Sequence, residues 1–177
     1  MESAIVALIC IALVVVGGMT LSQGFLSSMD TSSAGLEEMS ETAGDIMRTE
    51  LSPLGAVQAS ADTLEVTLRN SGQTKLSSFD SWDIIVQYYD ANGTYHVEWL
   101  PYKAGTPGEN QWTNEGIYLD AGNGTDEAFE PGILNPMEEL VIEARVDPAV
   151  GGDTTNLIVV TTPNGIPTSI SFAGYEP

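Results

Sequence analysis

Two short asparagine-containing patterns are the clearest chemical signals in this sequence. Residues 92–94 and 123–125 both read Asn-Gly-Thr, which fits the N-x-[ST] acceptor pattern for N-linked glycosylation. The Asn-Gly pair is also common in turns, and both patterns fall in segments that we expect to be loops. We predict that Asn92 and Asn123 carry glycans, with plain turn formation as the alternative explanation.

The other polar clusters match no catalytic or metal-binding pattern. Residues 120–127 gather oxygen ligands but lack the EF-hand spacing, so an acidic surface turn is expected there. One cysteine, Cys10, and one histidine, His96, leave little material for a metal cluster or for imidazole chemistry. No nucleophile motif or phosphate-binding loop is present. We therefore expect no enzymatic activity, no metal and no cofactor.

Composition restricts the class of protein further. The 177 residues, 42% of them apolar, are enough for one packed domain and an appendage. Twenty-five acids against five Lys and Arg give a net charge of −20, which excludes a basic surface for nucleic acid. This charge fits either an exposed polymer surface or a high-salt environment.

The first element that the sequence predicts is an apolar N-terminal segment. Residues 4–21 carry no charge, and the uncharged stretch between Glu2 and Asp30 is long enough to cross about 30 Å of bilayer. A signal peptide would carry Lys or Arg before its apolar run, whereas only Glu2 precedes this one. We expect either that a basic leader was removed just before Met1 or that the segment is an acidic-ended anchor.

The helix is expected to continue beyond membrane length. Apolar or small residues recur after alternating steps of four and three, which is a seven-residue repeat on one helix face. Ser52-Pro53 predicts a stop, giving one helix from about residue 2 to about residue 51. We expect this stripe to pack against copies of the chain, with packing on its own domain as the alternative. The residues of the stripe are Phe25, Met29, Ser32, Leu36, Met39, Ala43 and Ile46.

The remaining sequence alternates with the period of a β-strand. Together with the helix, this predicts an α+β chain: a helical region at residues 1–55 and an antiparallel, immunoglobulin-like β-sandwich at residues 56–177, without that fold's cysteine pair. The tryptophans are expected to supply core or subunit-contact area: Trp82, Trp99 and Trp112. Seven strands are predicted, at residues 64–68, 82–89, 95–100, 116–120, 139–146, 156–162 and 168–172.

Three segments of this chain resemble the archaellin branch of the type IV pilin superfamily. They are the apolar start MESAIVALICIALVVV, the strand TLEVTLRNSG and the C-terminal VVTTPNGIPTSISF. The resemblance implies that a prepilin peptidase-like enzyme removes a short basic leader. It also implies that an assembly platform moves the helix from the membrane into a helical bundle of copies, with the sandwiches outside.

The resemblance also implies which residues form the polymerisation interface. Bacterial type IV pilins usually place a glutamate at mature position five, where this chain has Ile5. Glu2 either pairs with a neighbour's terminal amine inside the apolar core or lies at a solvated end. The expected interface residues are Glu2, Ile5, Leu8, Ile11, Val15, Phe25, Met29, Leu36, Met39 and Ile46.

The function implied is that of a structural subunit of an archaellum-like surface filament, which polymerises through its N-terminal helix and serves motility. The chain would be membrane-embedded before assembly and extracellular afterwards. Two alternatives remain open at this point. One is an adhesive type IV pilin, and the other is a non-polymerising, membrane-anchored accessory protein of the archaellum machinery.

Overall fold

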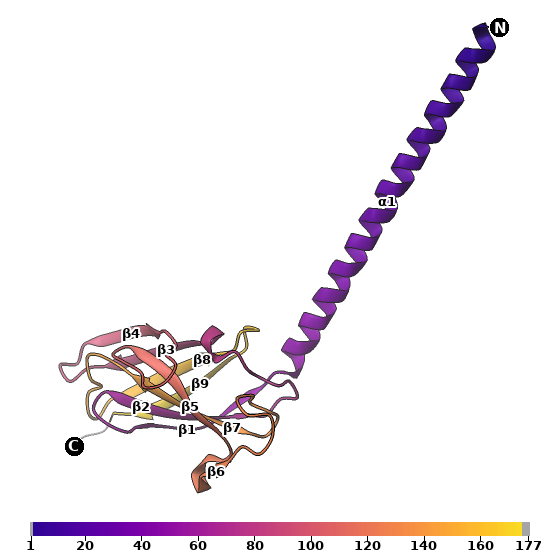
Figure 1. The fold of residues 1–177 in the computed structure, drawn as a ribbon. Helices are drawn as coiled ribbons and strands as arrows, with labels where there is room; N and C mark the ends of the chain where they lie inside the picture. Colours follow the sequence, from indigo (N-terminus) through magenta and orange to yellow (C-terminus); the bar gives the residue numbers. More distant parts are fainter. Residues whose placement is uncertain (1, 175–177) are drawn as a thin grey trace. The chain divides into compact units, whose positions relative to one another are not determined.

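The chain divides into two compact units between Gly44 and Asp45 (Figure 1). A computed structural model describes residues 2–174, and of Glu2 it describes only the backbone. The first unit is the greater part of helix α1 (Glu2–Arg48), and the second holds the last turn of that helix and all the strands. The predicted α+β fold class is confirmed.

Helix α1 runs without a break for 47 residues, which confirms that it continues past membrane length. It ends at Arg48, slightly before the expected residue 51. The loop after residue 70 takes over the backbone acceptors here, because the Gln73 amide donates to the Arg48 carbonyl over 2.7 Å and the Ser71 amide donates to the Glu50 carbonyl over 3.0 Å. Pro53 is therefore not the stop signal but lies in a strand.

The second unit is a sandwich of two antiparallel sheets, as predicted. The larger sheet has the order β1-β2-β7-β5-β6, and the smaller has the order β4-β3-β8-β9. The larger sheet contains β1 (Leu51–Gln58), β2 (Thr63–Asn70), β5 (Gln111–Asp120), β6 (Thr125–Asp126) and β7 (Glu139–Arg145). The smaller contains β3 (Asp83–Tyr89), β4 (Tyr95–Leu100), β8 (Thr155–Thr161) and β9 (Pro167–Ala173).

All seven predicted strands are present, and two further strands were not expected. Strand β1 contains Pro53 and Gly55, and its pairing with β2 shifts register between them, so its sequence does not alternate. Strand β6 has only two residues. Strand β5 begins five residues earlier than expected, because a register shift between Asn114 and Gly116 interrupts its alternation.

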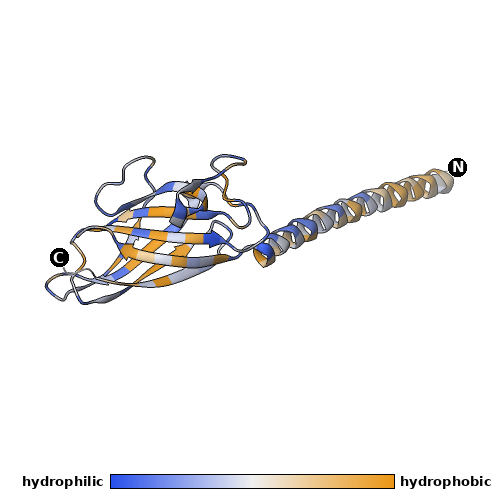
Figure 2. Cartoon of the chain, turned by 90° about the horizontal axis from the view of Figure 1, so that it is seen from below, coloured by the Kyte–Doolittle hydropathy of each residue, from blue (hydrophilic) through white to orange (hydrophobic). Residues whose placement is uncertain are grey.

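Alternating side chains from both sheets meet in one hydrophobic core. Leu64, Val66 and Leu68 of β2 point inward and are fully buried, and each such side chain stabilises the fold by about 1.5–3 kcal/mol. Trp82 and Trp112 are also buried, at 2% and 0% exposure, whereas Trp99 is 57% exposed. Figure 2 shows this alternation along the strands, and it also shows that α1 is most apolar towards its N-terminus.

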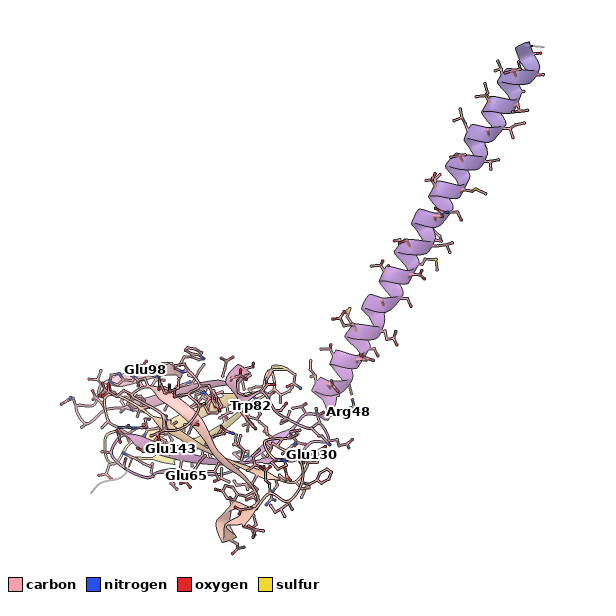
Figure 3. All side chains as sticks on the ribbon, in the orientation of Figure 1. Arg48, Glu65, Trp82, Glu98, Glu130 and Glu143 are labelled. Atoms are coloured by element: carbon pink, nitrogen blue, oxygen red, sulfur yellow. The ribbon has the colours of Figure 1, made fainter. Side chains whose placement is uncertain are left out.

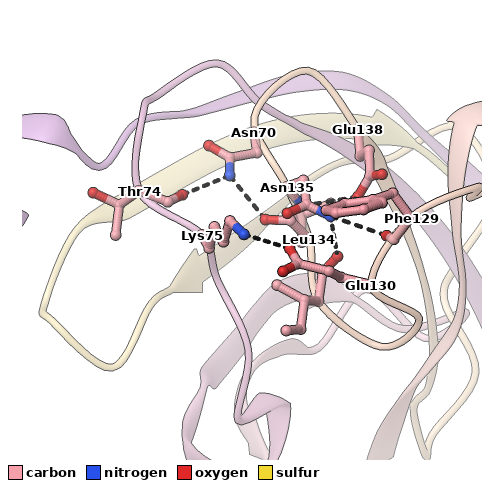
Figure 4. A network of polar contacts seen from close by, with 9 residues as sticks. Asn70, Thr74, Lys75, Phe129, Glu130, Leu134, Asn135 and Glu138 are labelled. Atoms are coloured by element: carbon pink, nitrogen blue, oxygen red, sulfur yellow. Dashed lines mark hydrogen bonds and ion pairs between the residues drawn. The ribbon is translucent and has the colours of Figure 1, made fainter.

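Two long loops at one end of the sandwich are joined through the buried Asn70 (Figure 4). Its amide nitrogen donates to the carbonyls of Thr74 and Leu134 over 2.8 and 3.0 Å. Close by, Lys75 forms an ion pair with Glu130. These contacts hold the loop after β2 against the loop before β7, and the same loop after β2 binds the end of α1.

An ion pair at the opposite end of the sandwich makes stability depend on pH. Hydrogen bonds from Arg145, Ser60 and Thr63 lower the pKa of Asp62 from 3.8 to about 2. Because the folded-state pKa is the lower one, this contribution is complete above pH 3.8 and is lost as the pH falls towards 2.

We predict that Asp62→Asn lowers the melting temperature at neutral pH and flattens its dependence on pH between about 4 and 2. Thermal unfolding of the full-length chain in detergent, followed by circular dichroism from pH 6 to pH 2, measures this. Asp153→Asn, at an exposed carboxylate, is the matched control. Parallel pH profiles for wild type and Asp62→Asn would contradict the prediction.

Candidate assembly surface

The N-terminal part of α1 exposes large apolar side chains in every direction, as Figure 3 shows. By length and composition this helix is able to cross a membrane. A helix that is apolar all round is stable only in apolar surroundings. The segment between Ile5 and Leu21 must therefore be covered by lipid or by other helices.

The predicted interface residues all lie on this helix. Eight of them are more than half exposed: Ile5, Leu8, Ile11, Val15, Phe25, Met29, Leu36 and Met39. Ile46 is 38% exposed, and the side chain of Glu2 lies outside the described residues. Since they are spread along a helix that rises about 1.5 Å per residue, one chain does not bring them together into a compact site.

The C-terminal half of α1 has two distinct faces. At about 100° per residue, the residues of the seven-residue repeat from Phe25 to Ile46 stay on one side, which we call the seam. The carboxylates lie on the opposite side: Asp30, Glu37, Glu38, Glu41 and Asp45. A neighbouring helix packed against the seam would leave these charges in water.

Two threonine hydroxyls in α1 donate back to carbonyls of the helix itself. The Thr20 hydroxyl donates to the Gly17 carbonyl over 2.9 Å and is also 3.1 Å from the Val16 carbonyl. The Thr31 hydroxyl donates to the Ser27 carbonyl over 2.9 Å. Internal hydrogen bonds of this kind let a polar side chain enter an apolar environment without an unpaired group.

Sequence reasoning selected one stripe of the N-terminal segment and missed the rest of its circumference. A helical periodicity template picks one face, whereas the hydropathy of the whole run marks all faces. The omitted large apolar residues that the structure exposes are Val6, Ile9, Leu13, Val14, Val16, Met19, Leu21 and Leu26.

The last turn of α1 and Thr49 form a junction within the second compact unit. Thr49 is buried, and its hydroxyl donates to the Asp45 carbonyl over 2.8 Å. The amide of Asn164, from the β8–β9 loop, donates to the same hydroxyl oxygen over 2.7 Å. Gly72 packs so closely that a Cβ would lie 2.4 Å from the Arg48 carbonyl. Loops from both sheets therefore fix the end of the helix, and no local sequence pattern indicated this.

The two glycosylation patterns lie at opposite ends of the sandwich. Asn92 is exposed in the β3–β4 hairpin, where the Asp90 carboxylate accepts from the amides of Asn92 and Thr94 over 2.8 Å. Hydrogen bonds from Thr94, His96 and Asn92 lower the pKa of Asp90. Its carboxylate thus stays ionised and fixes the hairpin turn.

Asn123 is also exposed, but its side chain is engaged. Its amide nitrogen donates to Oδ2 of Asp120 over 2.7 Å, and its backbone N–H donates to Oδ1 over 3.0 Å. These bonds lower the pKa of Asp120. Part of the acidic segment 120–127 is therefore a capped 3₁₀ turn, η2 (Ala121–Asn123).

Known proteins match this chain over both the helix and the sheets. The sequence profile of the archaeal-type flagellin family matches residues 2–172. The archaeal flagellum of Methanospirillum hungatei strain JF1 matches with a TM-score of 0.58 and 11% identity, covering 96% of this chain and 93% of that one.

A second similar structure is the archaellum periplasmic stator protein complex FlaF and FlaG from Sulfolobus acidocaldarius. It matches with a TM-score of 0.51 and 22% identity, covering 70% of this chain and 89% of that one. At these identities both likenesses show the fold alone. No curated protein matches the chain.

We predict that Gly72→Ala destabilises the junction by about 1–3 kcal/mol, because the added methyl group meets backbone atoms of Arg48 and Glu50. Gly55→Ala is the matched control, since a Cβ there meets nothing within 4 Å. Thermal unfolding of both variants measures the difference, and hydrogen exchange at residues 45–49 should rise in Gly72→Ala alone. Equal melting temperatures would show that this contact is not under steric constraint.

Proposed function

Because the chain belongs to the archaeal-type flagellin family, we propose that it is a structural subunit of an archaellum-like helical filament at the cell surface, where it serves motility. The observation that carries this proposal is the unbroken helix α1, apolar all round near its start and two-faced farther on. Such a helix requires other helices along its length once it has left the membrane.

Assembly moves α1 from lipid into a bundle of identical helices. Lipid tails are as apolar as leucine, so close packing between helices, rather than escape from water, favours the bundle in the first segment. Beyond Phe25 the seam faces neighbouring helices and the carboxylates face outward. We propose that Glu2 pairs with the terminal amine of a neighbour, because an unpaired charge among these apolar side chains would cost several kcal/mol.

In this proposal, residues 1–55 form the polymerisation region and residues 56–177 form the outer surface of the filament. The second region holds 18 acids and four bases, which keeps an exposed polymer surface soluble. The chain is membrane-embedded before assembly and extracellular afterwards. A prepilin peptidase-like enzyme and a membrane assembly platform are the partners that this route requires.

A second candidate function is that of a membrane-anchored accessory protein. It is favoured by the similarity of the fold to the stator protein complex FlaF and FlaG. Electron microscopy separates the two functions, since an accessory protein would occur as scattered membrane-bound subunits rather than in filaments. If filaments form, swimming and surface attachment of a deletion strain distinguish a motile filament from an adhesive pilus.

We predict that Met39→Asp abolishes filament assembly. The new carboxylate would lie in the seam between subunits, on the face opposite Glu37, Glu38 and Glu41, and burying it there would cost several kcal/mol in every copy. The measurement is filament yield by electron microscopy, together with the amount of subunit in the membrane.

Met39→Leu is the matched control, because this exchange should cost less than about 1.5 kcal/mol and leave filaments intact. Circular dichroism of both variants should show the same β-sheet signal, since residue 39 lies outside the sandwich unit. Equal filament yields for Asp and Leu would exclude this face as an assembly seam and favour the accessory protein.

We also propose that Asn92 and Asn123 are glycosylated, and the hydrogen bonds of the two side chains predict unequal occupancy. Transfer to Asn123 has to free the amide nitrogen that binds Asp120 over 2.7 Å. Occupancy at Asn92 should therefore exceed that at Asn123.

Intact-mass and peptide mass spectrometry of the native subunit measures both occupancies. Asp120→Ala should raise occupancy at Asn123, while Asp126→Ala, which changes an exposed carboxylate beside the same pattern, should not. A mass equal to that of the bare polypeptide would reject both sites without affecting the assembly proposal.

A further inference from the structure

An exposed row of three aromatic side chains and one valine lies on the outer face of the smaller sheet. Tyr95, Val97 and Trp99 alternate along strand β4 and point away from the core, and Tyr89 of β3 is paired with Tyr95. All four are between 42% and 57% exposed. We call these four residues the aromatic strip. An exposed apolar row on an edge strand is a liability for edge-to-edge aggregation unless something covers it.

The rings of the strip are fixed in place. The Tyr95 hydroxyl donates to Oε1 of Gln87 over 2.9 Å, and Nε1 of Trp99 donates to Oδ1 of Asp83 over 2.9 Å. The Tyr89 and Tyr95 ring centroids are 5.1 Å apart. Because these two polar groups already have partners within the sheet, the ring faces are what remains for contact with another group. Fixed aromatic rings lose little conformational entropy when they bind.

The glycosylation pattern at Asn92 lies at one end of this strip. Asn92 is three residues after Tyr89 and three before Tyr95, in the hairpin that joins their strands. The hairpin is held by the Asp90 carboxylate and by a hydrogen bond from the Asp90 amide to the Thr94 carbonyl over 2.9 Å. Within residues 2–174, the Asn92 side chain makes no hydrogen bond. A group attached there starts beside the strip.

We propose that the aromatic strip binds the first sugar rings of a glycan attached to Asn92; this inference rests on the proposed glycosylation. The C–H groups on one face of a pyranose ring carry partial positive charge, and an aromatic face carries partial negative charge. The first sugar stacks on Tyr89 and Tyr95, and later sugars follow β4 towards Val97 and Trp99. The sugars thereby cover the edge strand.

The covalent step is a glycosyl transfer from a lipid-linked sugar phosphate. The amide nitrogen of Asn92 forms a bond to the anomeric carbon of the sugar and loses one proton. The bond between that carbon and the phosphate oxygen breaks, and the lipid phosphate leaves with the bonding electron pair. The strip takes no part in this transfer and acts on the product.

The second pattern lacks this arrangement. The residue three positions before Asn123 is Asp120, whose carboxylate holds the Asn123 amide, instead of a tyrosine. A glycan on Asn123 also starts at the opposite end of the sandwich from Asn92. Asn123 is therefore an internal control for any effect of glycosylation that does not involve the aromatic strip.

Tryptophan fluorescence reports on the strip selectively, because Trp99 is 57% exposed while Trp82 and Trp112 are buried. The experiment compares acrylamide quenching of full-length wild type, Asn92→Gln and Asn123→Gln. The proteins are produced in the native host, extracted in detergent, and checked for sugar occupancy by mass spectrometry. A sugar stacked on the indole shields exposed ring surface from the quencher. We expect quenching to rise in Asn92→Gln and to stay unchanged in Asn123→Gln.

Two further variants keep the test independent of folding defects. Thr94→Val removes the hydroxyl that the N-x-[ST] pattern requires, leaves the acceptor Asn92 in place, and should reproduce the effect of Asn92→Gln. Packing of the glycan on the strip should raise the melting temperature above that of Asn92→Gln. With Asn92 occupied, Tyr89→Phe should keep this increase. Tyr89→Ser should lose this increase.

The outcomes separate the two proposals. A glycan at Asn92 with unchanged Trp99 quenching on its removal would overturn the packing inference and leave the glycosylation proposal intact. No sugar at Asn92 would overturn both. A third outcome is weak quenching in assembled filaments of both wild type and Asn92→Gln, together with strong quenching in both detergent-extracted proteins. This result would show that a second copy of the chain covers the strip, and it would also overturn the packing inference.

Discussion

Everything else in this chain depends on the need to cover the apolar surface of α1. From Ile5 to Leu21 the helix exposes large aliphatic side chains around its whole circumference, and each one contributes about 1.5–3 kcal/mol when it leaves water. The hydroxyls of Thr20 and Thr31 donate back to the helix, which keeps these two groups paired in apolar surroundings.

The junction at Thr49 holds the last turn of α1 within the second compact unit. The connection is made by side chains far apart in the sequence, since Asn164 reaches Thr49 from the β8–β9 loop. Thr162 donates a hydrogen bond to Oδ1 of Asn164 and so directs its amide nitrogen towards Thr49. Asn164 lies within the C-terminal segment VVTTPNGIPTSISF that carries part of the archaellin resemblance. This gives the segment a physical role: it holds the end of the helix.

The sequence was a good guide wherever periodicity decides the structure. The helix and the seven strands follow from the spacing of apolar residues, and the loop that contains Asn92 follows from its Asn-Gly pair. Strand β1 was not predicted, because Pro53 and Gly55 accompany a register shift that interrupts its alternation. Contacts such as Asn123 with Asp120, or Asn164 with Thr49, were not predictable, because they depend on loop conformations that no local pattern encodes. The exposure of Trp99 and the burial of Trp112 were not predictable for a similar reason, since strand register sets the side of the sheet that each side chain faces.

Charge sets a limit on what can hold such a polymer together. The sandwich region carries many more acids than bases, so neighbouring copies repel each other at low salt. The screening length is about 10 Å at 0.1 M salt and about 3 Å at 1 M, so the repulsion between outer domains weakens as salt rises. The seam contains no charged residue from Phe25 to Ile46, so contact between copies through the proposed seam would not depend on salt in this way. Attraction between copies is therefore more favourable through the helices than through the acidic sandwich region.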